Sequence, residues 1–303
     1  MNIRSGRIYL ALLLSLCTLR VYAQEKRAME LTDIMKFQQL RSPSFSHDGQ
    51  WVVLAAVPDR GDPRVLVYAA DGSVQFQLEG ANNPVLSNDG LWVAAVKTVP
   101  ASELLKSDRG KDKGPNTGMI LLNTGSGQQQ SFENVRSFTF SNDSRWLFFH
   151  HHGSKAQKKE DKENNGSPGP GTTLSILELG SAARDTIPFV SGFAVDSISQ
   201  HLAYVVADTF AIGNGIFSHS LSEPAASTHT LFADSASWAA ELKWNNRTGQ
   251  LAFLAGITGE KGRKDLSDLY LWSPGDQEAR VVLSDDELQE DWCIWHKNKL
   301  QWS

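Results

Sequence analysis

The sequence predicts an all-β protein, a partial β-propeller of about five four-stranded blades. Short apolar and β-branched runs alternate with Asp-Gly, Thr-Gly and Pro-Gly turn signals. One hairpin pattern recurs along the chain, and a second hairpin follows most of its copies. An ordinary β-sandwich with tight turns is the alternative, but a Trp stands in the same place in three copies, which favours the propeller.

The composition is typical of a globular protein and excludes some classes of function. The 303 residues include 29 basic and 34 acidic ones, for a net charge of -5, and 41% are hydrophobic. A mildly acidic chain without a long basic stripe predicts no nucleic-acid partner. No glycine-rich phosphate loop occurs either, so the sequence predicts no nucleotide cofactor and, more broadly, no cofactor at all.

Residues 1–23 have the pattern of a secretory signal peptide. Basic residues precede the apolar run Ile8 to Leu19, and cleavage is expected near Ala23. We expect no lipid attachment at Cys17, because the bulky Leu16 stands where such sites need a small residue. The prediction is a secreted or periplasmic protein.

The mature chain predicted by this cleavage keeps one cysteine, Cys293, so it can form no internal disulfide. We interpret Cys293 as a buried, inert thiol. Beyond the leader no apolar stretch is long enough to span a membrane.

Residues 24–41 are predicted to form a helical lead-in to the propeller. Thr32 is a candidate N-cap, and the apolar residues Ile34, Met35, Phe37 and Leu40 would share one side of the helix. The propeller itself is predicted over residues 42–303.

The repeat is the most informative feature of the chain. Residues 45–56 read FSHDGQWVVLAA, residues 85–96 read VLSNDGLWVAAV, and residues 139–149 read TFSNDSRWLFF. Weaker copies follow at 195–206 and 244–255. The aligned apolar residues that mark the blade starts are Phe45, Leu86, Phe140, Val195 and Trp244. Units of this length with two hairpins each are typical of propeller blades.

Each strong copy has the chemistry of a tight hairpin. The aspartates can accept hydrogen bonds from the turn backbone, the glycines can take positive φ, and the large residue that opens the return strand suits packing between sheets. The predicted structural residues are Asp48, Gly49, Trp51, Asp89, Gly90, Trp92, Asp143, Trp146, Trp244 and Trp302.

Two polar insertions interrupt the pattern, at residues 103–117 and 153–171. Both fall between the second and third strands of their blades, so both should emerge on the same edge of the sheets. We expect solvated loops there, with a binding role for their lysine-rich parts as the alternative.

The last residues, ending at Trp302, repeat the start of the fifth copy. Trp302 lies 58 residues after Trp244, close to the repeat spacing. This similarity predicts that the chain ends at the first strand of a sixth blade and is a fragment of a longer protein. A complete five-bladed ring with a short closing strand is the alternative.

Other residue clusters give no support for a metal site. His150 to His152 end a return strand, where adjacent side chains point to opposite faces and no third ligand is evident. The acidic residues between Asp285 and Asp291 lack the spacing of a calcium loop. We therefore predict no metal ligands.

The repeat resembles the propeller of the prolyl oligopeptidase family of serine peptidases, in its dipeptidyl-peptidase and acylaminoacyl-peptidase branch. The resemblance covers residues 24–303, and it is first evident in residues 31–54, LTDIMKFQQLRSPSFSHDGQWVVL. It implies a propeller that gates peptide substrates and a partner α/β-hydrolase domain, mostly after it in sequence. Periplasmic propellers of the Tol system carry nearly the same turn, so a free-standing module that binds a protein or peptide remains the alternative.

The chain itself contains no catalytic residue that the resemblance would supply. The family's nucleophile lies in a Gly-x-Ser-x-Gly elbow, and no such motif occurs here. The adjacent Glu pair that binds the substrate amino terminus in the dipeptidyl branch is also absent from the sequence. We therefore expect no peptidase activity from this chain by itself.

Overall fold

The computed structural model describes Glu30 and residues 37–302, apart from positions 74, 108–114, 154–169, 209–211, 223–227, 235–236, 258–266, 290–293 and 295–298. The strands belong to one compact unit, Gln38–Ser303. The predicted signal peptide, most of the helical lead-in, Cys17 and Cys293 lie outside the described residues.

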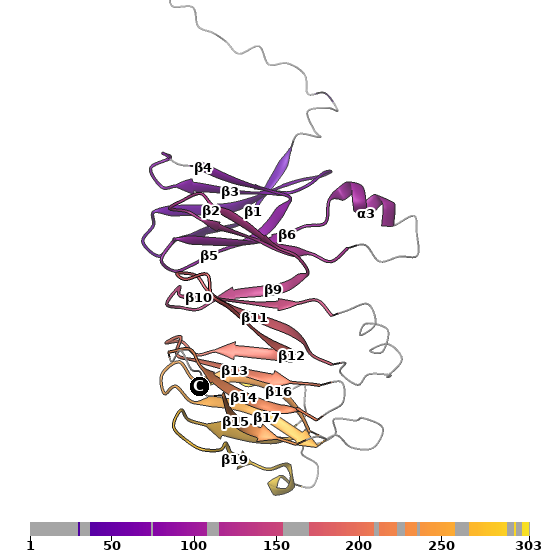
Figure 1. The fold of residues 1–303 in the computed structure, drawn as a ribbon, viewed down its shortest axis with the longest axis vertical. Helices are drawn as coiled ribbons and strands as arrows, with labels where there is room; N and C mark the ends of the chain where they lie inside the picture. The colour runs from indigo at the N-terminus through magenta and orange to yellow at the C-terminus, as the bar shows by residue number, and fades with distance from the viewer. Residues whose placement is uncertain are drawn as a thin grey trace, which may run out of the picture. The chain divides into compact units, whose positions relative to one another are not determined.

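The described strands form five antiparallel repeats, called blades here (Figure 1). The first two blades contain β1 (Gln38–Phe45), β2 (Trp51–Pro58), β3 (Arg64–Ala69) and β4 (Gln75–Glu79), then β5 (Ala81–Leu86), β6 (Trp92–Lys97), β7 (Gly118–Asn123) and β8 (Gln129–Phe132). The third and fourth contain β9 (Val135–Phe140), β10 (Trp146–His151), β11 (Thr172–Glu178), β12 (Arg184–Val195), β13 (His201–Val206), β14 (Gly215–Ser220) and β15 (Thr228–Ala233). The fifth contains β16 (Ser237–Trp244), β17 (Leu251–Ile257), β18 (Asp268–Trp272) and β19 (Arg280–Leu283).

Within each blade the strands pair in chain order, which is the topology of a propeller blade. The third and fourth blades are joined in one seven-stranded sheet, because the first part of β12 pairs with β11 and the second part with β13. These sheets confirm the predicted all-β class and its four-stranded repeat. The number of blades in a complete propeller stays a prediction.

Alternation along the central strands places successive residues in different hydrophobic cores. Val93 packs with the first blade, whereas the next residue, Ala94, packs with the third. In β10, Phe149 faces the second blade and Phe148 faces the fourth, and both are fully buried. Each blade in the middle of the series is therefore apolar on both faces, which explains its continuous apolar strands.

The boundary of the helical lead-in was wrong at its C-terminal end. Gln38 to Arg41 belong to β1 and pair with Pro58 to Ala55 of β2. The cross-strand hydrogen bonds of this ladder satisfy the backbone that a helix would have satisfied internally. Leu40, which we placed on the apolar side of a helix, is 67% exposed on the strand.

The first insertion is partly helical, not wholly a loop. Its first described residues belong to α3 (Ala101–Ser107), which begins after Pro100, whose carbonyl accepts from the backbone N–H groups of Glu103 and Leu104. Alanine, glutamate and leucine favour helix, which the polar composition of the segment concealed. Both insertions do leave between the second and third strands of their blades, after β6 and β10.

The end of the chain differs from the expected first strand of a sixth blade. Residues 299–302 are irregular, and the Trp302 indole donates a hydrogen bond of 3.2 Å to the Lys243 carbonyl of β16. Among the described helices, none has the length and apolar composition needed to cross a bilayer.

Candidate functional site

The hairpin turns that open the blades share one hydrogen-bond pattern. In the second blade, the buried Ser87 hydroxyl donates to the Asp89 carboxylate at 2.6 Å and accepts from the Trp92 N–H at 3.0 Å. The Asp89 carboxylate also accepts from the Leu91 N–H. The same bonds link Ser46 with Asp48 and Ser141 with Asp143. Sequence reasoning singled out the aspartates but missed these serines, although the signal was present in all three copies.

Side chains also connect the second turn to the third and the third turn to the fourth. The Asp89 N–H donates to the Ser144 hydroxyl, and the Asp143 N–H donates to the Ser199 hydroxyl. The Asn88 amide donates to the Asn142 carbonyl in the same direction. We call this series of turns and its links the turn ladder.

The residue at the tight corner of each turn has a positive φ. Gly49 and Gly90 take φ values of 69° and 72°, and Ser144 and Ser199 take 61° and 59° in the third and fourth blades. A Cβ on Gly90 would lie 3.1 Å from both Ser46 and Trp51 of the first blade, so a side chain there would require these neighbours to shift by a few tenths of an ångström.

The predicted tryptophans lie between neighbouring blades. Trp51 packs between the first and second blades, Trp92 between the second and third, and Trp146 between the third and fourth. Trp244, at the end of β16, is buried between the fourth and fifth blades and donates to the Ala194 carbonyl. These residues position the sheets, and Trp146 also contributes to the lining of a hollow described below.

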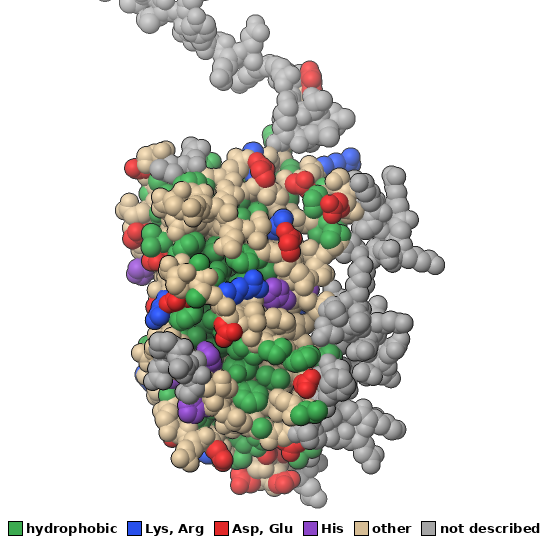
Figure 2. All heavy atoms as spheres, in the orientation of Figure 1, with side chains coloured by type: hydrophobic (Ala, Val, Ile, Leu, Met, Phe, Trp, Pro, Cys, Tyr) green, Lys and Arg blue, Asp and Glu red, His purple; other side chains and the backbone are tan. Residues whose placement is uncertain are grey.

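Two hollows flank the third blade, and they bring together residues that sequence reasoning did not connect. One, of about 670 Å³, lies toward the fourth blade and is called the Glu178 hollow. The other, of about 420 Å³, lies beside the end of β10 and is called the Arg184 hollow. Figure 2 shows basic and histidine side chains gathered at the height of this third blade.

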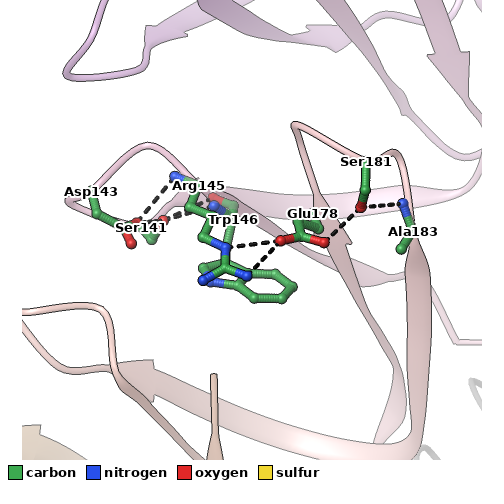
Figure 3. Close-up of polar contacts among 7 residues, drawn as sticks. All are labelled: Ser141, Asp143, Arg145, Trp146, Glu178, Ser181 and Ala183. Atoms are coloured by element: carbon green, nitrogen blue, oxygen red, sulfur yellow. Dashed lines mark hydrogen bonds and ion pairs between the residues drawn. The ribbon is translucent and has the colours of Figure 1, made fainter. Parts of the chain in front are cut away.

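An ion pair at the mouth of the Glu178 hollow is fixed by its neighbours (Figure 3). Arg145 donates to the Glu178 carboxylate through Nε at 2.8 Å and Nη2 at 2.7 Å, and its guanidinium lies 5.0 Å from the centre of the Trp146 ring. Ser181 donates to the other carboxylate oxygen at 2.6 Å. The hydrogen bond from Ser181 and the Arg145 charge hold the pKa of Glu178 below its ordinary value.

On the side of the fourth blade, the wall of the Glu178 hollow contains aromatic and titratable side chains. Tyr204 stacks on Phe217 with ring centres 5.6 Å apart, and burial raises the pKa of the Tyr204 phenol. Burial lowers the pKa of His219, while the carboxylate of Asp185 acts in the opposite direction. The described lining of this hollow holds two basic side chains, Arg145 and Arg184, and two acidic ones, Glu178 and Asp185.

The Arg184 hollow has a different charge balance. The Arg184 guanidinium lies 5.1 Å from the centre of the Phe149 ring and donates to the Ser175 hydroxyl at 2.9 Å. His151 and His152 share this lining with Asn134, and no Asp or Glu belongs to it among the residues that the structure describes. Arg184 contributes to the lining of both hollows, and its guanidinium lies over the Phe132 ring of the second blade, whereas Asp185 lines only the Glu178 hollow of the two.

The three consecutive histidines have separate, well-defined partners. Nδ1 of His150 lies 2.7 Å from Arg136, which can only donate, so the His150 ring is neutral and its Nε2 donates to the Val190 carbonyl. Burial, and then the Arg136 charge, lowers the pKa of His150. His152 donates through Nε2 to Thr117, because the proton of that hydroxyl is used on the Val135 carbonyl.

Ser175 and His151 form a pair that superficially resembles a nucleophile and its base. The Ser175 hydroxyl lies 2.9 Å from His151 Nε2. Ser175 is fully buried, however, and already accepts a hydrogen bond from Arg184. No substrate atom can reach that hydroxyl, so the pair has a structural role. Among the described residues, no group of three or more His, Cys, Asp or Glu side chains is placed to hold a metal ion.

Comparisons with known proteins give a likeness of fold. No protein-family model and no curated protein sequence matches this chain. Its structure is similar to the β-propeller domain of the trilobed protease of Pyrococcus furiosus, with 12% identity over 82% of this chain and 71% of that one, at a TM-score of 0.43. It is also similar to a prolyl endopeptidase, with 10% identity over 83% and 37% of the two chains and a TM-score of 0.47.

An acylaminoacyl peptidase of Pyrococcus horikoshii is similar too, with 13% identity over 82% of this chain and 40% of that one, at a TM-score of 0.39. The chain therefore spans well under half of these last two proteins.

Proposed function

We propose that this chain is the substrate-gating propeller region of an exported serine peptidase of the prolyl-oligopeptidase kind. The observation that carries the proposal is the repeated Ser-x-Asp-Gly-x-Trp hairpin and its weaker copies, which resemble the blade starts of that family. In the proposed protein, an α/β-hydrolase domain elsewhere in the same polypeptide carries the catalytic residues. The propeller admits short peptides to it and excludes folded proteins.

The reading frame beyond the codon for Ser303 provides the first test. We expect it to continue through further blades to a Gly-x-Ser-x-Gly elbow, followed by Asp and His. A stop codon directly after Ser303 in an intact gene would overturn the peptidase proposal and favour a free-standing binding module of the Tol kind.

Activity and export test the same proposal at the level of the protein. The complete product should hydrolyse short peptides but not a folded protein of the same composition, and Ala in place of its elbow serine should abolish hydrolysis. The 303-residue chain alone should not react with a fluorophosphonate probe for activated serines. N-terminal sequencing of the exported product should begin at Gln24, whereas an unprocessed terminus would contradict the predicted leader.

A further inference from the structure

We propose that the Arg184 hollow is a binding site for the carboxylate group of a small ligand. The hollow has a volume of about 420 Å³, within the usual range of small-molecule sites, and is lined by β10, β11 and β12. The inference does not depend on the peptidase proposal, because it rests on the charges and hydrogen bonds of the third blade alone.

Among the described residues, the lining of this hollow holds the Arg184 charge and no carboxylate. Asp185, the acidic neighbour in sequence, lines the Glu178 hollow, to which Arg184 also contributes. Among the described residues, the bond to Ser175 occupies one of the five N–H donors of the guanidinium. A planar carboxylate with two acceptor oxygens matches the remaining donors of such a group.

The guanidinium is held in place before any ligand arrives. It lies over the rings of Phe149 and Phe132, at 5.1 Å and 5.9 Å from their centres. The Ser175 hydroxyl accepts a hydrogen bond from one amino group of the Arg184 guanidinium and also contacts His151 Nε2. A charged group held in this way loses little conformational freedom on binding, which favours affinity.

The backbone around the hollow is also constrained. Phe189, which contributes to the lining, has a φ of 55°, a conformation that is costly for a bulky residue. Gly171 approaches it so closely that a Cβ there would lie 2.0 Å from the Phe189 carbonyl oxygen. On the other side, Asn134 also has a positive φ and donates through its amide to the His152 carbonyl. These contacts give the hollow a wall with a defined shape.

The test compares a carboxylate with its neutral analogue on the full chain. N-acetylphenylalanine and N-acetylphenylalanine amide would be titrated by ligand-observed NMR, since Phe189 and Pro188 offer an apolar wall to the ring. We expect the acid to bind about tenfold or more tightly than the amide, because only the acid can form a charge-assisted pair with Arg184. Equal binding of the two compounds, or no binding of the acid, would overturn the proposal.

Matched variants locate the site. Arg184→Gln should abolish the preference for the acid, whereas Arg145→Gln, which removes a charge on the other face of the same blade, should leave it intact. Because the first variant also loses ring contacts, Arg184→Lys serves as a folded check that keeps the charge and should retain part of the preference. A preference that survives in Arg184→Gln would place the site elsewhere. Inorganic phosphate that binds more tightly than the acid would refute the assignment to a carboxylate.

Discussion

The turn ladder and the two hollows of the third blade place polar side chains in different surroundings. In the ladder, Ser87 both donates and accepts within the fold and is almost fully buried. In the hollows, Arg184 and Asp185 are exposed, and much of their hydrogen-bonding capacity faces solvent. The difference indicates that polar groups which the fold already satisfies are structural, while those with unused donors or charge are available to a ligand.

The largest effect is expected at the tight corner of the second turn. Gly49→Ala places a side chain at positive φ in open space and should cost about 1–2 kcal/mol of unfolding free energy. Gly90→Ala adds contacts at 3.1 Å with Ser46 and Trp51, so it should cost a further ~1–3 kcal/mol of unfolding free energy. Chemical denaturation of both variants measures the difference. Equal stabilities would show that the turns of the first two blades do not press on one another.

Loss of a ladder hydroxyl should have the next largest effect. Ser87→Ala leaves the Trp92 N–H without its partner and removes a donor to Asp89, which should cost about 1–3 kcal/mol. The matched control is Ser181→Ala, whose exposed hydroxyl donates to Glu178 at the mouth of the Glu178 hollow. Its midpoint in denaturant should stay close to that of the parent protein, and an equally large loss there would remove the distinction between ladder and hollow.

The sequence predicted those features of the turn ladder that depend on neighbouring residues within one turn. Asp89 and Gly90 are neighbours within one turn, so their pattern was readable, and the hairpins lie where the repeat placed them. The link from Asp89 to Ser144 joins residues of different blades, and only the packing of the blades creates it. Likewise Arg184, Ser175 and His151 meet through the register of β10, β11 and β12.

Two predictions of local structure were wrong because composition and apolar spacing did not determine the outcome. The apolar spacing around Leu40 fits a helix, but pairing with β2 determines the structure of Gln38 to Arg41. In the first insertion the polar composition suggested a loop, although the residues after Pro100 favour helix. Neither outcome follows from hydrophobic periodicity alone.

The smallest predicted effect concerns pH and sharpens the distinction between the three histidines. Burial lowers the pKa of His150 in the folded state, so the unfolded chain binds the proton more readily. Stability should therefore fall as the pH drops below about 6.5, the pKa of an unperturbed histidine, and continue to fall until His150 is protonated in the fold as well. His151 and His219 have pKa values shifted in the same direction and add to the slope.

A variant separates the contribution of His150 from theirs. Gln has an amide that can accept from Arg136 and donate to the Val190 carbonyl, but it does not titrate, so His150→Gln should flatten the dependence of unfolding free energy on pH. His47→Gln, at an exposed position in the first turn, is the matched control for the loss of a histidine side chain. If His150→Gln keeps the full slope, the imidazole is not held neutral by Arg136 and Val190. The protons taken up on unfolding would then belong to His151 and His219, beside the hollows.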